Sequence, residues 1–500
     1  MKPLPRSLRA LLPLVAAVAA AATLALAPGA ALAGGPGLLV GAAEDLPKQP
    51  TLLQAKVQVE LARLVGFTAL RVTSQWTRGL TAPTASELAQ LKNAADAANL
   101  AGIRVYLSVY PTGSSQTPLD DESRQQFAAY AASIVQKLPS FGDVIVGNEP
   151  NLNRFWLPQF NADGSDAAAP AYVALLAQTY DALKAVRSSV RVIGGALSPR
   201  GIDRPGTGRD THSPTAFIPD MGAAYRASGR TLPLMDAFAF HPYGDNSSQP
   251  PTFQHPNSTT ITLSDYSKLV ALLGKAFDGT AQPGSTIPIV YDEFGVESTI
   301  PAEKTAAYSG AEPATTRPVD EATQGDSYRQ AIQIAFCQPT VETLLLFHVS
   351  DEPALAGWQS GPYYADGTPK ASRDTVKAAA RDARGGVISR CPDLALSPQP
   401  AVAWPHGASL GATALAALLT CDVDCIYYAR LERYPSHTTT LVARGTARSG
   451  EPLTISFPAR RVARALYRFT LKATAPLNAG PPTTVTSEPF LLPVAKTGSR

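Results

Sequence analysis

The stretch Val-Ile-Val-Gly-Asn-Glu-Pro-Asn at residues 144–151 decides the fold, because it has the pattern of a buried strand that ends in polar residues. Three β-branched residues in a row favour a strand, and Pro150 stops it because proline cannot donate a hydrogen bond to a neighbouring strand. Asn148 and Glu149 are therefore expected at the carboxyl end of a strand. A second stretch, Ile-Pro-Ile-Val-Tyr-Asp-Glu-Phe-Gly at 287–295, brings Glu293 to a strand end in the same way.

Two carboxylates in this setting suit the cleavage of a glycosidic bond. One would protonate the leaving oxygen while the other attacks the anomeric carbon or activates water. An isolated Asn-Glu-Pro is more often a simple turn out of a strand. A third strand end strengthens the chemical interpretation, because His241-Pro-Tyr243 follows the apolar run 235–240.

Eight strand-like runs alternate with helix-like runs along the chain. The strands are expected at 38–43, 69–72, 104–109, 144–147, 191–197, 235–240, 287–293 and 343–347. The clearest helices are expected at 52–64, 84–100, 121–138 and 172–186. Polar or aromatic residues end nearly every strand, as the rim of a closed barrel requires. An open doubly wound sheet, the alternative, would usually show a glycine-rich phosphate turn after an early strand. The pattern predicts an eight-stranded β/α (TIM) barrel with chemistry at the carboxyl ends of its strands.

Asn148-Glu149, His241-Pro-Tyr243 and Glu293 together resemble clan A glycoside hydrolases, which are retaining enzymes built on such a barrel. The resemblance covers about residues 38–384 and fits families 5 and 39 loosely. It implies that Glu149 is the acid/base and Glu293 the nucleophile. It also implies that Asn148 binds the 2-hydroxyl of the sugar.

The same resemblance suggests a network that supports the nucleophile. Tyr243 is expected to hold its carboxylate, with His241 as a neighbour in that network. Arg71 occupies the position on the second strand where family 5 carries an arginine beside the nucleophile. A purely structural ion pair at the end of the barrel is an equal alternative for Arg71.

The aromatic residues depart from the family 5 pattern at the eighth strand. That family usually has a tryptophan there, whereas this chain has Phe347-His348. Trp358, in the loop that follows, is expected to replace it as a platform for the sugar. Trp76 and Trp156 are further stacking candidates, although each could equally be a packing residue. The acidic pair Asp351-Glu352 at the same rim is interpreted as a helix cap, with a contact to polar or cationic groups of the substrate as the alternative.

Composition and charge exclude one class of partner. The chain has 500 residues, 45% of them hydrophobic and 17% charged, with a net charge of +3. The basic surplus lies in the first residues and after residue 399, which leaves the middle of the chain acidic. A nucleic-acid binder would carry a basic surface there, so nucleic acid is not the expected substrate. We expect a carbohydrate substrate, and neither a metal ion nor a cofactor.

The first 33 residues have the three parts of a secretory signal peptide: basic residues, an alanine-rich apolar run at 11–26, and Ala31-Leu-Ala33 before the expected cleavage point. A membrane anchor is the alternative. The four cysteines then favour disulfides over zinc, because an exported chain meets an oxidising environment. We expect the pairs Cys337–Cys391 and Cys421–Cys425, the latter from its closeness in sequence.

The composition changes after the last barrel helix. We expect the barrel domain at 34–392, followed at 393–500 by a linker and a small all-β, immunoglobulin-like sandwich. Its strands are expected near 438–443, 453–457 and 465–474, with an apolar strand region at 408–419. Trp404 is its only tryptophan, which favours a spacer over a carbohydrate-binding module. Its basic surplus would allow contact with anionic cell-wall polymers.

The sequence thus predicts a secreted, extracellular, retaining glycoside hydrolase that cleaves a poly- or oligosaccharide through a double displacement by two glutamates. A transglycosylase with the same covalent intermediate is the nearer alternative. A catalytically inactive, carbohydrate-binding surface scaffold is the more distant one.

Overall fold

A computed structural model describes residues 35–386, 400–403, 414–421, 425–448, 451–458, 462–463, 465–474 and 482–492. The expected signal peptide, the linker, Cys391 and Trp404 lie outside these ranges.

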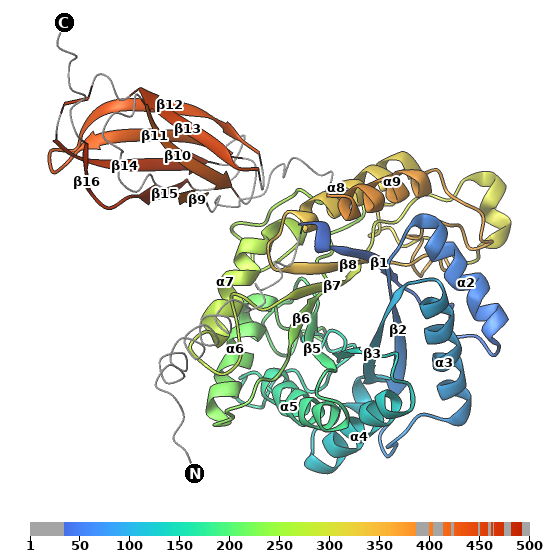
Figure 1. The fold of residues 1–500 in the computed structure, drawn as a ribbon. Coiled ribbons are helices and arrows are strands. Elements are labelled where there is room, and N and C mark those ends of the chain that lie inside the picture. The colour runs from blue at the N-terminus through green and yellow to red at the C-terminus, as the bar shows by residue number, and fades with distance from the viewer. Residues whose placement is uncertain are drawn as a thin grey trace, which may run out of the picture.

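Eight parallel strands close into a barrel, in the order β1 to β8, with β8 pairing back onto β1 (Figure 1). The strands are β1 (Leu39–Ala43), β2 (Ala69–Trp76), β3 (Arg104–Pro111), β4 (Asp143–Val146), β5 (Arg191–Leu197), β6 (Ala237–Phe240), β7 (Ile289–Phe294) and β8 (Val341–Phe347). The predicted TIM barrel is confirmed. Strands β2 and β3 run further than expected, because their pairing continues through polar residues as far as Trp76 and Pro111.

Helices surround the barrel between successive strands (Figure 1). They are α2 (Leu52–Val65), α3 (Ala85–Leu100), α4 (Asp121–Lys137), α5 (Ala168–Val186), α6 (Pro214–Ala227), α7 (Tyr266–Phe277), α8 (Glu321–Phe336) and α9 (Ser372–Arg384). Several begin at a side chain that accepts a hydrogen bond from the first turn, as Thr51, Thr84 and Asp120 do. Gly66 ends α2 with a φ of 87°, a conformation that glycine adopts without strain.

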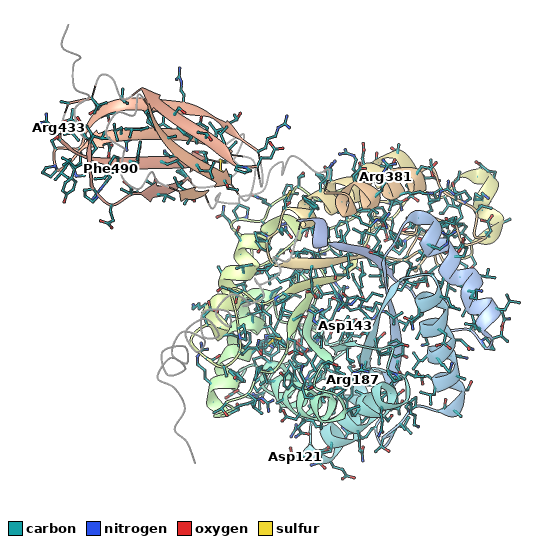
Figure 2. All side chains as sticks on the ribbon, viewed as in Figure 1. Asp121, Asp143, Arg187, Arg381, Arg433 and Phe490 are labelled. Atoms are coloured by element: carbon teal, nitrogen blue, oxygen red, sulfur yellow. A yellow bond between two sulfur atoms is a disulfide. The ribbon has the colours of Figure 1, made fainter. Side chains whose placement is uncertain are left out.

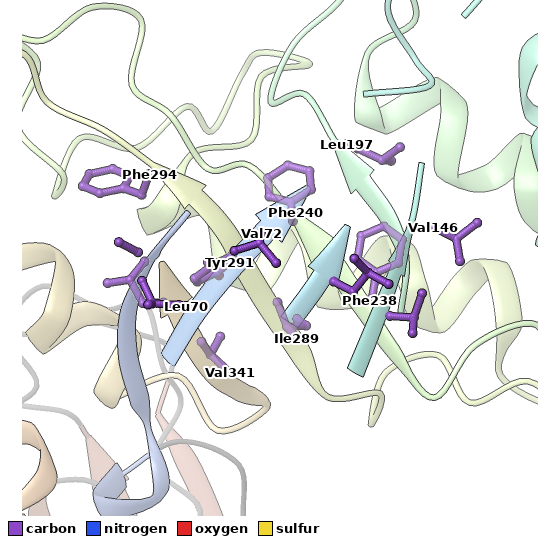
Figure 3. Close-up of a cluster of buried hydrophobic side chains, with 14 of the residues drawn as sticks. Leu70, Val72, Val146, Leu197, Phe238, Phe240, Ile289, Tyr291, Phe294 and Val341 are labelled. Atoms are coloured by element: carbon purple, nitrogen blue, oxygen red, sulfur yellow. The ribbon is translucent and has the colours of Figure 1, made fainter. Parts of the chain in front are cut away.

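Both faces of the barrel sheet are buried. One face lines the interior of the barrel, and the other packs against the surrounding helices. Residues such as Ile145, Ile193 and Val290 form a cluster inside the barrel, whereas their neighbours in sequence pack outward against the helices. Figure 3 shows part of the outward cluster, including Val146 and Tyr291. This alternation along the strands, which a register shift interrupts in β5, decides which side chains can reach the mouth of the barrel.

The amino ends of the strands are joined by ion pairs. Asp143, labelled in Figure 2, accepts from Arg104 at 2.7 Å and from Arg191 at 3.0 Å. Arg191 also contacts Glu342 at 2.5 Å. These ion pairs link β3, β4 and β5 to the start of β8. They lie at the amino-terminal end of the barrel, which in this fold contributes to stability.

The C-terminal region consists of two antiparallel sheets, with strand orders β13-β10-β9 and β12-β11-β14-β15, and β16 pairs with β14. The strands are β9 (Pro400–Ala403), β10 (Ala414–Cys421), β11 (Cys425–Arg433), β12 (Thr438–Ala447), β13 (Leu453–Pro458), β14 (Ala465–Thr474), β15 (Thr483–Thr486) and β16 (Phe490–Leu492). Ile455 and Phe457 of one sheet share a core with Phe469 and Leu471 of the other, so the sheets form a sandwich.

One expected disulfide is confirmed, since Cys421 and Cys425 are bonded between β10 and β11. Cys337, which follows α8, is also disulfide-bonded. Its expected partner, Cys391, is outside the described residues.

Among the helices that the structure describes, none combines the length and the apolar character needed to cross a membrane.

Candidate active site

A cavity of about 470 Å³ opens at the carboxyl ends of the barrel strands. It is lined by residues from most of these strand ends and from the loops that follow: Ala43, Glu44, Asp45, Arg71, Thr73, Gln75, Tyr110, Pro111, Thr112, Gly113, Asn148, Glu149, Arg154, Phe155, Tyr243, Glu293, Phe347, His348, Glu352 and Trp358. The two expected catalytic glutamates thus share one cavity.

The alternation of the strands explains how polar side chains reach it. Ala69 of β2, Ala239 of β6 and Val290 of β7 point into the barrel. Side chains two positions further on point the same way. Those positions hold charged or titratable residues: Arg71, His241 and Asp292.

Arg71 joins two carboxylates of strand β7. Its Nη2 donates to Glu293 Oε1 at 2.6 Å and its Nη1 to Asp292 Oδ2 at 2.7 Å. The three side chains are almost fully buried. Burial alone would lower the pKa of Arg71, but the charges of Glu293 and Asp292 outweigh it and raise that pKa. The expected position of Arg71 beside Glu293 is found.

His241 lies among three carboxyl groups. Its Nδ1 is 3.1 Å from Glu149 Oε1 and 3.4 Å from Glu293 Oε2, and its Nε2 is 3.3 Å from Asp292 Oδ1. Burial alone would lower the pKa of His241, but the charges of Glu293 and Asp292 outweigh it and raise the pKa well above its usual value. Asp292 responds in the opposite sense: burial would raise its pKa, but His241 and Arg71 together lower it.

Tyr243 completes the surroundings of Glu293. Its hydroxyl donates to Glu293 Oε2 at 3.0 Å. Burial and the negative charge of Glu293 raise the pKa of Tyr243 well above its usual value, so the hydroxyl keeps its proton. Both oxygens of Glu293 are therefore bonded to donors, one to Arg71 and the other to Tyr243.

The turn after β4 places Glu149 in an unusual backbone conformation and leaves a polar atom of Asn148 unpaired. Glu149 has a φ of 42°, a region that residues with side chains seldom occupy. Asn148 is buried, and its Oδ1 has no hydrogen-bond partner in the described part of the chain. Buried polar atoms usually have a partner, so an unpaired one at a cavity wall is available to a ligand.

The three candidate tryptophans are placed differently. Trp358 lines the cavity and packs on Tyr243, with ring centroids 5.0 Å apart. Trp76 and Trp156 are 0% and 1% exposed and lie outside the cavity wall. Trp76 packs against Phe127 in the helical layer, and Trp156 packs against Tyr172. The structure therefore places Trp76 and Trp156 in packing positions, because neither presents a ring face to the cavity.

The interpretation of Asp351-Glu352 as a helix cap is wrong, since α9 begins only at Ser372. Asp351 instead forms a buried ion pair with Lys370 at 2.8 Å. Sequence reasoning also missed Asp292, which precedes Glu293 directly. The period of two in β7 could have found it, because Asp292 follows the inward-facing Val290.

The closed parallel barrel with a cavity at its carboxyl ends defines the protein as a (β/α)₈-barrel protein. No family model matches the chain, and no curated protein matches it.

Among solved structures, the chain is similar to a β-glucuronidase from Bacteroides uniformis at 12% identity and a TM-score of 0.44, over 90% of this chain and 46% of that one. It therefore spans less than half the length of that protein. It is also similar to a family GH5-4 endoglucanase from a Clostridium species at 11% identity and a TM-score of 0.41, over 66% and 85% of the two chains. A β-glycosidase, BGL167, is similar at 15% identity and a TM-score of 0.44, over 71% and 96%.

Proposed function

We propose that this protein is a retaining glycoside hydrolase that cleaves O-glycosidic bonds of a poly- or oligosaccharide. The observation that carries the proposal is the position of His241 Nδ1 between Glu149 Oε1 and Glu293 Oε2. Because one atom lies within 3.1 Å and 3.4 Å of these two oxygens, the oxygens are no more than about 6.5 Å apart. Retaining enzymes hold their carboxyl groups about 5 to 5.5 Å apart, whereas inverting enzymes need roughly 6.5 to 9.5 Å.

The hydrogen bonds support different roles for the two glutamates. Glu293 accepts from Arg71 and Tyr243, which stabilise a negative charge and suit a nucleophile. Within the described residues, neither arginine nor tyrosine bonds the Glu149 carboxyl. Glu149 thus lacks the donors that hold Glu293, and we assign it the role of the acid/base.

The reaction follows from these roles. Glu149 gives its proton to the glycosidic oxygen while a Glu293 oxygen attacks the anomeric carbon, and the aglycone leaves with that proton. Water then attacks the glycosyl-enzyme ester as Glu149 removes a proton from it, which restores both carboxyl groups. A sugar hydroxyl that donates to Asn148 Oδ1 would satisfy this otherwise unpaired buried oxygen.

Transglycosylation shares the first step and differs only in the acceptor, so product analysis separates the two activities. The inactive scaffold is disfavoured by the buried network, since Arg71, Asp292 and His241 have no role in it that would offset the cost of burying their charges. Export is part of the proposal, and the bonded Cys337, Cys421 and Cys425 support it.

The test replaces each glutamate separately and adds azide. Glu293→Ala should abolish turnover of every aryl glycoside, because no covalent intermediate can form. Glu149→Ala should lose about 10²- to 10⁴-fold on glycosides with poor leaving groups. On activated aryl glycosides it should recover with azide and yield a glycosyl azide of retained configuration. Glu122→Gln, on the exposed surface of α4, is the matched control. A Glu149→Ala enzyme with wild-type activity on a natural glycoside would refute the proposal.

A further inference from the structure

The titratable side chains of the cavity wall that take no part in the proposed chemistry include Glu44, His348 and Glu352. They follow strands β1 and β8, which are neighbours in the barrel. Strand β8 is four strands away from β4 in either direction around the ring, so it lies across the barrel from Glu149. The acid/base acts at the leaving group, and the side chains across the ring therefore face the glycone.

His348 presents one defined atom to the cavity. Its Nδ1 lies 2.9 Å from the carbonyl oxygen of Ala43. A carbonyl only accepts, so Nδ1 carries the hydrogen and the orientation of the ring is fixed. The Nε2 atom is buried and has no hydrogen-bond partner among the described residues. It is 3.5 Å from Glu352 Oε1, which is too long for a strong hydrogen bond.

The two carboxylate oxygens of Glu352 differ, because one accepts a backbone hydrogen bond and the other faces His348. Its Oε2 accepts from the backbone nitrogen of Trp358 at 3.0 Å, which ties the carboxylate to the aromatic wall of the cavity. A Cβ on Gly357 would fall 1.8 Å from that same oxygen, so a side chain there would displace the Glu352 carboxylate. Oε1 is left to face His348 and the cavity.

Glu44 positions this pair. It accepts from the backbone nitrogens of Leu46 at 2.9 Å, Val349 at 3.1 Å and Ser350 at 3.3 Å. The last two residues directly follow His348, so the Glu44 carboxylate holds the end of β8 against the end of β1. Glu44 is accordingly a positioning residue.

Acids outnumber arginines in the wall of the cavity as a whole. The acids of the wall are Glu44, Asp45, Glu149, Glu293 and Glu352, and its arginines are Arg71 and Arg154. Arg71 is bonded to Asp292 and Glu293, whereas Arg154 acts on Glu352 only through its charge. The contact with His348, and to a smaller extent the charge of Arg154, lower the pKa of Glu352, so its carboxyl group is ionised. A glycone carboxylate placed against Glu352 Oε1 would therefore meet a negative charge.

We propose that His348 and Glu352 bind two neighbouring hydroxyl groups of an uncharged glycone, and that Glu352 excludes sugars that carry a carboxylate. The Nε2 atom of His348 and the Oε1 atom of Glu352 form an ion pair at 3.5 Å, so both are near enough to contact hydroxyl groups on adjacent carbons of one pyranose ring. Each hydroxyl can then bond one atom of the pair, while Trp358 packs against the ring. This inference rests on the proposed glycosidase function and narrows its substrates to neutral sugars.

The test compares 4-nitrophenyl β-glucoside with the β-glucuronide, and the β-galactoside with the β-galacturonide. Each pair differs only in a carboxylate. The full chain should favour the neutral member of each pair by at least about 100-fold in kcat/KM. Glu352→Gln, which keeps the shape but removes the charge, should narrow that ratio by about 10-fold. Glu122→Gln removes one exposed negative charge elsewhere and should leave the ratio unchanged.

Binding of the same glycosides, followed by the fluorescence of Trp358 and the other tryptophans, separates the two proposals. If the chain binds the neutral members preferentially but cleaves none, the selectivity holds and the proposed hydrolase function fails. If it cleaves both members equally well, or if Glu352→Gln weakens both equally, the hydrolase stands and the selectivity is overturned. A wild-type preference for either uronide also overturns it.

Discussion

The backbone nitrogen of Glu149 donates to the carbonyl oxygen of Ala196 at 2.8 Å, and both residues have positive φ angles, 42° and 49°. The bond joins the end of β4 to β5 and keeps Glu149 in a conformation that costs about 1 to 3 kcal/mol. Strain of this size persists only where the surrounding structure enforces it. Glu149, the proposed acid/base, is thus positioned by backbone contacts as well as by its side chain.

Gly147, two residues earlier, makes this turn sensitive to substitution. It has a φ of 93°, and an added Cβ would lie 2.9 Å from the ring of Tyr172. Gly147→Ala should destabilise the protein by about 1 to 3 kcal/mol and should reduce kcat by displacing Asn148 and Glu149. Thermal unfolding and steady-state kinetics measure the two effects. Gly142→Ala, where an added Cβ meets nothing within 4 Å, is the control. If Gly147→Ala and Gly142→Ala have the same unfolding temperature and the same kcat, the turn at Gly147 is not strained.

Asp292 should matter to catalysis although it lines no part of the cavity. Asp292→Asn removes the negative charge that Arg71 and His241 share, so the two cations would compete for Glu293. We expect kcat/KM to fall by about 10²-fold or more, since a misplaced or over-stabilised nucleophile attacks poorly. Asp236→Asn is the matched control, because Asp236 pairs with Lys184 near the opposite end of the barrel. Asp236→Asn should lower the stability of the protein without changing kcat/KM. If kcat/KM falls by the same factor in both variants, Asp292 has no specific role in catalysis.

Substitutions of Trp358, in the cavity wall, and of Trp156, in a packing position, can be compared directly. Trp358→Ala should raise KM by about 10-fold with a smaller change in kcat, because a packing surface for the sugar is lost. Trp358→Phe should restore part of that binding. Trp156→Phe changes a buried ring and should lower the unfolding temperature without changing KM. If Trp156→Phe alters KM as much as Trp358→Ala does, the cavity wall has been assigned wrongly.

His241 should make stability depend on pH. Its pKa is raised in the folded protein by Glu293 and Asp292, against the opposing effect of burial, whereas the unfolded chain has the ordinary value near 6.5. The folded state therefore binds the proton more tightly. The resulting stabilisation is complete below about pH 6.5 and is lost as the pH rises through the folded pKa.

Unfolding temperatures of the wild type and of His241→Asn, measured from pH 5.5 to 9, check this expectation. The difference between the two proteins should be largest at the acidic end and should shrink as the pH rises. A difference that grows with pH would show that the histidine is held in its neutral form.

The barrel and most of its site could be predicted from the sequence because both depend on local patterns. Apolar runs mark the strands, and the residues that end them mark the rim, which is how Glu149, His241 and Glu293 were found. Arg71 followed from its place on the second strand. Each of these inferences needs only the period of a strand and the closure of the ring.

The errors concern contacts between distant residues. Whether Trp76 faces the cavity or the helices depends on how β2 continues beyond the apolar run, and hydrophobicity does not reveal that. The partner of Asp351 is Lys370, which arrives from a later segment. Asp292 was overlooked because it stands beside a more conspicuous acid, and its function appears only once Arg71 and His241 are placed around it.

The charges of the site come from opposite ends of the chain, with Arg71 on β2 and the two acids on β7. Neither half of the barrel contains all of the proposed catalytic residues, so we expect turnover to begin only after the ring has closed. During refolding, the return of activity therefore reports the pairing of β1 with β8, while tryptophan fluorescence reports local packing that can form earlier. The rate at which turnover returns during refolding should therefore equal the rate at which the barrel closes. Two separately expressed half-barrels should become active only when they are mixed.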